Sequence, residues 1–178
     1  MAYTRDQLIS LVQDYAYGAG IDPAIAVAQI ARESANFRPD VVYGPFVGGA
    51  GERGMSQFTP ATWARFGYGP HTNAYDPDYA MTAWGEYMKY LLNLFNWDME
   101  KALQGYNGGE GNVQRGTVSS AARRYAREVM AKAGSIPEPS HPPTEYPDPD
   151  PDSGGAPNWW LIAGVGAIAL ALMILIED

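Results

Sequence analysis

The stretch "IDPAIAVAQIARESANFRPD", residues 21–40, sets the pattern for the fold: a capped, largely apolar helix that carries one carboxylate near its end. Asp22 is a good N-cap, because its side chain can accept a hydrogen bond from a free backbone N–H. Pro23 follows at the first helical position, where its missing N–H costs nothing. Three apolar residues precede Glu33 by three, seven and eight positions and share its helical face: Ile30, Ala26 and Ile25.

Glu33 is the charge that this pattern places on an apolar face. If the face packs inward, desolvation disfavours the ionised carboxyl and raises its pKa. A carboxyl that is partly protonated near neutral pH can serve as a general acid. The alternative is a solvated residue at a fraying helix end, paired with Arg32 or Arg38. The other motifs of the chain favour the catalytic interpretation.

Capping signals recur along residues 1–134 and predict a mostly α domain. They are a capping residue followed by proline, or a Thr-x-x-Gln capping box. Helices are therefore predicted to begin near Thr4, at Thr59–Pro60 and at Asp76–Pro77, and to run over 97–106 and 118–134. Residues 38–58 are rich in glycine and predict a long loop, of a kind that is often functional.

Composition excludes several classes of protein and site. The 178 residues include no cysteine, so no thiolate site exists, and with only His71 and His141 a multi-histidine metal centre is hard to build. We expect neither a metal nor a cofactor. The net charge is −8, but all 12 basic residues lie within 1–133, and the acidic excess belongs to 134–178. The helical part is nearly neutral and lacks the basic surface of a nucleic-acid-binding protein.

Two segments follow the helical domain. Residues 135–157 combine proline with acidic side chains, which predicts a disordered, extended linker. Residues 158–176 hold an apolar run headed by Trp159 and Trp160, long enough to cross a bilayer, which takes about 17–25 residues. The N-terminus lacks the pattern of a secretory signal peptide. We expect a domain tethered by a spacer to a membrane through this helix.

Three patches follow Glu33 in order: "GERGMSQFTPATWARFG" at 51–67, "ALQGYNGGEGNV" at 102–113 and "ARRYAREVM" at 122–130. With the Glu33–Ser34 pair they resemble the lysozyme-like lytic transglycosylases, of the soluble-transglycosylase type that cleaves peptidoglycan. The matching residues are Glu33, Ser34, Gly54, Gln57, Pro60, Thr62, Tyr106, Asn107, Gly109 and Tyr125. Ser56 departs from the family pattern, because a large side chain of the cleft wall is expected there.

The resemblance implies a lysozyme-like fold and a reaction that uses one carboxyl group. Glu33 would protonate the oxygen between N-acetylmuramic acid and N-acetylglucosamine, then accept the proton of the C6 hydroxyl and leave a 1,6-anhydro end. Water, metal and cofactor take no part. Tyr125 would orient the carboxyl. The other implied substrate contacts are Ser34, Gln57, Tyr106 and Asn107, with Met55, Phe58 and Tyr43 as apolar walls.

Two other functions remain open. A hydrolase resembling goose-type lysozyme would need a second carboxylate or an ordered base to activate water, for which Asp40, Glu52 and Glu110 are the nearby residues. A membrane-anchored structural or glycan-binding protein would bind the strand without cleaving it. The expected setting is the virion of a phage with an internal membrane, where the enzyme opens the wall beside virion membrane or vertex proteins. The alternative is a bacterial inner membrane, with the enzyme facing the periplasm.

Overall fold

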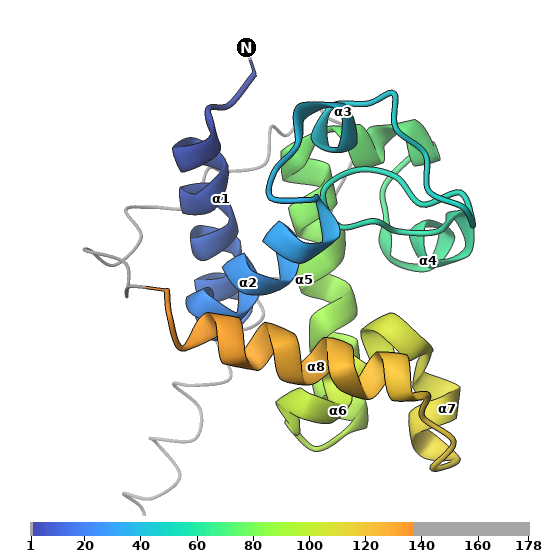
Figure 1. Cartoon of the computed structure of the whole chain (residues 1–178). Coiled ribbons are helices and arrows are strands. Elements are labelled where there is room, and N and C mark those ends of the chain that lie inside the picture. Colours follow the sequence, from blue (N-terminus) through green and yellow to red (C-terminus); the bar gives the residue numbers. More distant parts are fainter. Residues whose placement is uncertain (1, 137–178) are drawn as a thin grey trace, which may run out of the picture. The chain divides into compact units, whose positions relative to one another are not determined.

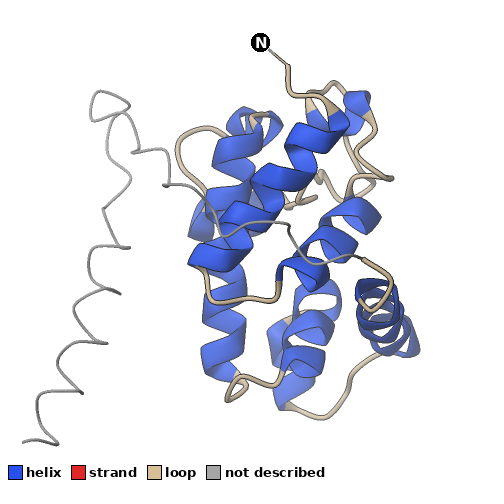
Figure 2. Ribbon diagram, turned by 90° about the vertical axis from the view of Figure 1, so that its left-hand side faces the viewer, coloured by secondary structure: helices blue, strands red, loops and turns tan. Residues whose placement is uncertain are grey.

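The computed structural model describes residues 2–136, which form helices joined by loops (Figures 1 and 2). The elements are α1 (Arg5–Gly18), α2 (Pro23–Glu33), α3 (Pro39–Val42), α4 (Pro60–Phe66), the short 3-10 helix η1 (His71–Tyr75), α5 (Pro77–Leu94), α6 (Met99–Gly108), α7 (Glu110–Gln114) and α8 (Ser120–Ala133). Within the described residues, strand-like pairing is limited to an isolated bridge between Arg53 and Phe58. The predicted mostly α fold is confirmed.

Helix α5 runs through the middle of the domain (Figure 1). Helices α1, α4, η1 and α6 pack against it, and α8 packs across both α2 and α6. Trp84 and Met88 on α5 are fully buried and join one apolar cluster with Ile30 of α2 and Val129 of α8. This cluster holds the end of α2 against α8, which brings distant parts of the sequence to one place.

The helix starts follow the predicted capping residues. Thr4 and Gln7 form both hydrogen bonds of a capping box at α1. The side chain of Asp22 accepts a backbone N–H at the start of α2. Thr59 and Asp76 cap α4 and α5, each with proline in the first turn. These starts are local properties of the chain and are confirmed by the structure.

The glycine-rich segment 38–58 contains one short helix, α3, and is otherwise a loop. Gly54 has a φ of +71°, and a Cβ atom at this position would collide with the carbonyl group of Ala74 in η1. Gln57 also has a positive φ, of +49°. The close approach of the loop to η1 therefore requires glycine at position 54, and it fixes the place from which Gln57 projects.

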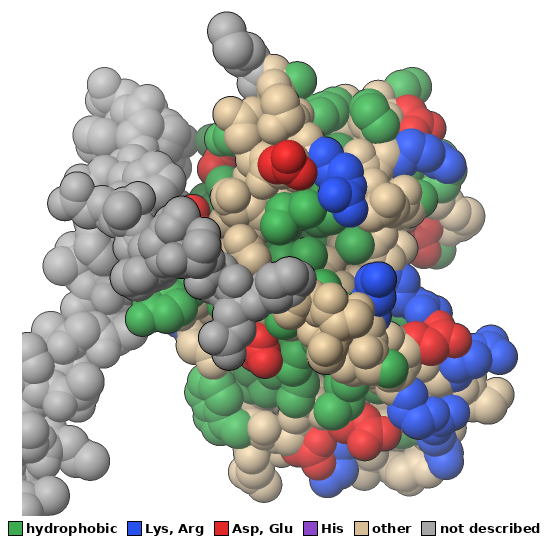
Figure 3. All heavy atoms as spheres, turned by 60° about the vertical axis from the view of Figure 1, so that its left-hand side comes forward, with side chains coloured by type: hydrophobic (Ala, Val, Ile, Leu, Met, Phe, Trp, Pro, Cys, Tyr) green, Lys and Arg blue, Asp and Glu red, His purple; other side chains and the backbone are tan. Residues whose placement is uncertain are grey.

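The predicted membrane helix, 158–176, lies outside the described residues, as does the predicted linker beyond Ile136. Across residues 2–136, no helix has both the length and the apolar character that crossing a membrane requires. Figure 3 shows Lys and Arg side chains mixed with Asp and Glu over the described part of one face. That mixture agrees with the nearly neutral charge of the helical domain.

Candidate active site

Glu33 is the last residue of α2, and the chain turns away immediately after it. Ser34 caps this end: its Oγ donates to the carbonyl oxygen of Ile30 at 2.7 Å and accepts from the N–H of Phe37 at 2.9 Å. Residues 35–37 then all adopt left-handed backbone, with φ between +51° and +63°. Because the chain turns sharply after α2, the side chain of Glu33 lies at the end of the helix.

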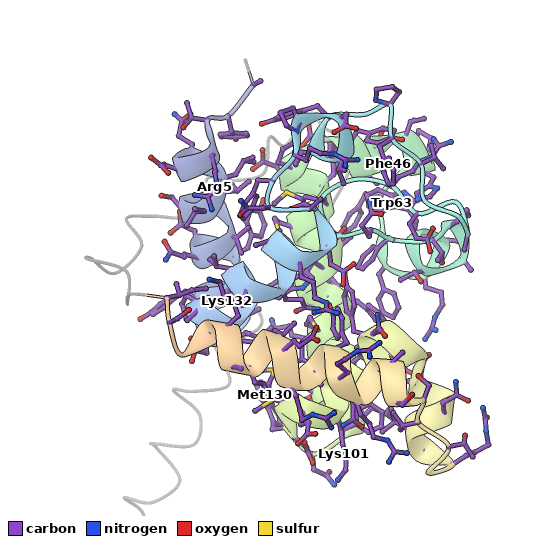
Figure 4. All side chains as sticks on the ribbon, in the orientation of Figure 1. Arg5, Phe46, Trp63, Lys101, Met130 and Lys132 are labelled. Atoms are coloured by element: carbon purple, nitrogen blue, oxygen red, sulfur yellow. The ribbon has the colours of Figure 1, made fainter. Side chains whose placement is uncertain are left out.

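The C-terminal end of α2 borders a cavity of about 340 Å³. Four residues predicted to contact the substrate line it together with Glu33: Gln57, Phe58, Tyr106 and Asn107. They come from the loop before α4 and from the end of α6. In Figure 4, Phe46 and Trp63 mark the α3–α4 side of the domain, and Lys101 and Met130 mark the α6–α8 side. The lining residues therefore come from both sides.

Tyr125 of α8 donates a hydrogen bond from its phenol to Oε1 of Glu33. Burial raises the pKa of Glu33 to about 7, an effect strengthened by the negative charge of Glu52. The bond from Tyr125 and the positive charge of Arg32 act in the opposite direction and lower this pKa. Burial also raises the pKa of Tyr125 well above its usual value, so the phenol keeps its proton as a donor.

Arg32 is held beside this pair. Its guanidinium group lies over the ring of Tyr125, 4.8 Å from the ring centroid, and forms an ion pair with Glu128 of α8. The contact places a fixed positive charge near the carboxyl of Glu33. Arg32 therefore does not neutralise Glu33 directly, as the solvated alternative supposed; its ion-pair partner is Glu128.

The two amide side chains and the phenol beside Glu33 are suited to hold polar sugar groups. The phenol of Tyr106 donates to the carbonyl oxygen of Ser56 at 2.6 Å, which ties α6 to the loop. Nε2 of Gln57 donates to the carbonyl oxygen of Gly54 at 2.8 Å. Asn107 is exposed at the rim of the cavity. Amides offer both donors and acceptors, the groups that acetamido and hydroxyl functions need.

Three side chains expected at the cleft lie elsewhere. Ser34 is fully buried and its hydroxyl serves the backbone at the end of α2, so it cannot reach a bound acetamido group. Met55 is fully buried in the core and is not an apolar wall of the cavity. Ser56 is also fully buried, so its small side chain does not open the cleft wall. The order of the motif places Met55 and Ser56 near the site, but the backbone turn at 54–57 points their side chains inward.

Tyr43 is also absent from the cavity wall, and its hydroxyl donates to the carbonyl oxygen of Tyr3 at 3.1 Å. Other lining residues were not predicted to belong to the site: Gly48, Gly49, Thr59, Thr62 and Tyr87. Thr59 was predicted only as a helix start, and Thr62 only as part of the family motif. Tyr87 lies inside α5, where an aromatic residue at helical spacing resembles an ordinary core residue. Its ring packs against Tyr106, with centroids 5.3 Å apart, and so supports the wall.

The three carboxylates considered for a second catalytic role differ in placement. Glu52 lines the cavity that Glu33 also lines, and its Oε2 accepts from the N–H of Ala50 at 2.8 Å. Asp40 pairs with Arg38, and Glu110 pairs with Arg65. Among residues 2–136, no group of three or more His, Cys, Asp or Glu side chains could hold a metal ion. Glu33 and Glu52 are therefore the carboxylates that the cavity offers.

Comparison with known proteins agrees with this geometry. Residues 10–129 match the transglycosylase SLT domain family. The chain is similar to the 70 kDa soluble lytic transglycosylase from Escherichia coli, with 23% identity and a TM-score of 0.57 over 70% of this chain. It is also similar to an inactive Glu-to-Gln mutant of the lytic transglycosylase Slt from Pseudomonas aeruginosa, with 19% identity and a TM-score of 0.59 over 70% of this chain.

In each case the chain spans 23% of the length of the solved protein. The structural similarities show a shared fold and confirm the predicted lysozyme-like architecture. The family match covers most of the described helical domain, from within α1 to within α8. This chain therefore belongs to the transglycosylase SLT domain family.

Proposed function

We propose that this chain is a peptidoglycan lytic transglycosylase that cleaves the β-1,4 bond between N-acetylmuramic acid and N-acetylglucosamine and forms 1,6-anhydro ends. The observation that carries the proposal is the carboxyl of Glu33, held by Tyr125 in a cavity that Gln57, Tyr106 and Asn107 line. Its pKa of about 7 lets the group give a proton and take one back near neutral pH.

The first half of the reaction breaks the glycosidic bond. Protonated Glu33 donates its proton to the bridging oxygen, and the electron pair of the bond to the anomeric carbon moves onto that oxygen. The N-acetylglucosamine end leaves as an alcohol. The 2-acetamido group of the substrate stabilises the positive anomeric carbon, as in glycosidases that use substrate assistance.

The second half closes the new ring. Ionised Glu33 accepts the proton of the C6 hydroxyl, and the C6 oxygen forms a bond to the anomeric carbon. Glu33 returns to its protonated form, and no water is consumed. Because the nucleophile belongs to the bound sugar, holding the sugar in place supplies much of the acceleration. The amides of Gln57 and Asn107 and the packed ring of Tyr106 are suited to this task.

The products test the proposal directly. The full chain is incubated with purified peptidoglycan, and the released fragments are analysed by mass spectrometry. We expect 1,6-anhydro ends from the wild type, and release reduced by about 10²–10⁴-fold in Glu33→Gln, the usual contribution of a general acid. Glu100→Gln removes an exposed carboxylate outside the cavity and is the matched control. Equal release by Glu33→Gln and wild type would refute the assignment.

Hydrolysis is the second candidate function, because Glu52 shares the cavity with Glu33 and its charge acts on that group. A carboxylate in this position could activate water, as in glycosidases with two carboxyl groups. Reducing ends that disappear in Glu52→Gln would establish this reaction. Anhydro ends that persist in Glu52→Gln would exclude it, and a wild type that binds peptidoglycan without releasing fragments would indicate a glycan-binding protein.

The proposal extends to the setting of the enzyme. The apolar run at 159–176 supports anchoring in a membrane, and the acidic, proline-rich residues before it suit a spacer between membrane and wall. We place the protein in the internal membrane of a phage virion, where local wall opening serves delivery of the genome. Detection of the full chain in purified particles tests this placement. Detection in the bacterial inner membrane alone would favour the periplasmic alternative.

A further inference from the structure

One part of the cavity wall is a short turn in the glycine-rich loop, residues 48–52, of which Gly48, Gly49 and Glu52 line the cavity. Two backbone hydrogen bonds close the turn. The N–H of Gly48 donates to the carbonyl oxygen of Glu52 at 2.9 Å, and the N–H of Gly51 donates to the carbonyl oxygen of Gly48 at 3.0 Å. The turn therefore has a defined shape, although it belongs to no helix.

The side chain of Glu52 folds back over this turn. Its Oε2 accepts from the N–H of Ala50 at 2.8 Å. The same oxygen lies close to the backbone of Gly48, because a Cβ atom at position 48 would come within 2.3 Å of it. Glycine at position 48 therefore leaves the room in which the carboxylate of Glu52 reaches Ala50.

Gly49 carries free peptide groups at the cavity. Within the described part of the chain, neither its N–H nor its carbonyl oxygen has a hydrogen-bond partner. A Cβ atom at this position would meet nothing within 4 Å, so the space beside it is open. A peptide N–H and C=O can pair with the acetamido and hydroxyl groups of a glycan strand. Such contacts favour a turn that is already ordered, because a loose turn has to be ordered when the ligand binds.

We propose that Glu52 is a positioning residue for the proposed transglycosylase reaction: its carboxylate holds the turn 48–52 so that the peptide groups of Gly49 bind the sugar that lies beside the acid. The inference rests on the proposed function. It assigns Glu52 to substrate binding rather than to the activation of water, since its Oε2 is engaged with Ala50. The role requires an acceptor at the right distance and does not require a charge, because an amide oxygen accepts the same N–H.

Two substitutions separate the reach of Glu52 from its charge. Glu52→Gln keeps the length and an acceptor oxygen, whereas Glu52→Asp keeps the charge and shortens the side chain by a methylene group. The full chain is assayed on a soluble glycan strand that gives separate kcat and KM values. We expect KM to rise about tenfold in Glu52→Asp, the effect of losing one hydrogen bond to a charged group, with kcat nearly unchanged. In Glu52→Gln, KM should stay within about threefold of wild type.

The opposite ranking would overturn the proposal. A general base fails when its charge is removed, so a loss of kcat in Glu52→Gln that exceeds the loss in Glu52→Asp would mean that the carboxylate acts on water. Unchanged kcat and KM in both variants would also overturn it. Glu100→Gln and Glu100→Asp are the matched controls, because Glu100 is exposed and lies outside the cavity, and they should leave both constants unchanged.

Gly48→Ala tests the same contact from the backbone side. The new Cβ atom would displace the carboxylate of Glu52 from Ala50, so KM should rise about tenfold although Glu52 is still present. In a Glu52→Ala background the carboxylate is already absent, and the same substitution should change KM by less than about twofold. An equal rise in both backgrounds would overturn the proposal, because the methyl group would then act without Glu52.

Amide hydrogen exchange reports on the turn in the absence of substrate. Ala50 is exposed, so protection of its N–H depends on the bond to Glu52. We expect this N–H to exchange about tenfold faster in Glu52→Asp than in wild type, and at nearly the wild-type rate in Glu52→Gln. Equal exchange in all three proteins would overturn the proposal, whatever the activities of the variants.

The proposed function and the role of Glu52 fail in different experiments. A wild type that forms no anhydro ends refutes the proposed function. A wild type that forms them, with Glu52→Asp and Gly48→Ala that bind the glycan as wild type does, refutes only the role of Glu52.

Discussion

The phenol of Tyr125 donates a hydrogen bond to Oε1 of Glu33, although 92 positions of sequence separate the two residues. The packing of α8 against α2 makes this contact. Burial raises the pKa of Glu33 to about 7, whereas the bond from Tyr125 and the charge of Arg32 limit that rise. The pKa of Glu33 near 7 therefore results from two opposing influences: burial raises it, and residues of α8 and α2 lower it.

This balance predicts how activity depends on pH. The acid step needs protonated Glu33, so kcat/KM on a soluble glycan should decline as pH rises through about 7. The pH dependence of kcat/KM reports groups of the free enzyme and is therefore the appropriate measurement. A decline centred near the ordinary glutamate pKa of 4.5 would contradict the burial of this carboxyl.

Removing the hydroxyl of Tyr125 should shift that decline. The bond lowers the pKa of Glu33, so in Tyr125→Phe the pKa should rise and the falling limb should move to higher pH. We also expect kcat to fall about tenfold, because the carboxyl loses an orienting bond to a charged group. Rate profiles of both proteins over the same pH range provide the check. A limb that stays in place would show that the bond does not act on the reacting carboxyl.

The raised pKa also makes a prediction about stability. The folded state holds the Glu33 proton more tightly than the unfolded state, so wild type loses stability as pH rises from about 4.5 to about 7. A shift of this size corresponds to roughly 3–4 kcal/mol. Glu33→Gln lacks this dependence. Urea unfolding should find the variant relatively more stable at pH 8 than at pH 5, compared with wild type; an equal difference at both pH values would contradict the prediction.

Ser34 separates a structural role from a substrate contact. Ser34→Ala removes both hydrogen bonds at the end of α2 and leaves the N–H of Phe37 without this acceptor. We expect a loss of about 1–3 kcal/mol in the free energy of unfolding, measured by urea denaturation. The KM for a soluble glycan should stay within about twofold of wild type. A large rise in KM without loss of stability would restore the sugar-binding role that the burial of Ser34 excludes.

Substitution by alanine should lower stability strongly at one glycine of the long loop and hardly at all at another. Gly54→Ala forces a side chain into left-handed backbone and against Ala74, so we expect a loss of more than about 3 kcal/mol, or failure to fold. Gly49→Ala meets open space and should stay within about 0.5 kcal/mol of wild type. Thermal unfolding of the two variants measures both effects. Similar melting temperatures would show that the loop does not approach η1 as closely as described.

Much of the fold was predictable because its signals are local. Helix starts are specified by hydrogen bonds within one turn, made here by the side chains of Asp22, Thr59 and Asp76. The structure places a helix after each of them. The order of motifs also predicted a site made of Glu33, Gln57, Tyr106, Asn107 and Tyr125. In the structure the first four residues line one cavity, and Tyr125 hydrogen bonds to Glu33. These predictions needed no knowledge of how the helices pack.

The direction in which each side chain points was not local. Met55 and Gln57 are two positions apart, yet one is buried in the core and the other lines the cavity, because positive φ values at Gly54 and Gln57 turn the backbone between helices. Tyr87 looks like an ordinary member of a buried helix face. Its place in the cavity wall depends on its contact with Tyr106 of α6, which no local pattern encodes.

By itself, the sequence determined a mostly helical domain with one glutamate suited to acid catalysis, since caps, apolar spacing and motif order are written along the chain. Only the tertiary structure decided that α8 supplies the partner of this glutamate and that Ser34 and Met55 face inward. The physical reason is that a pKa, a cavity and a hydrogen-bond direction arise from burial and from partners that folding brings together.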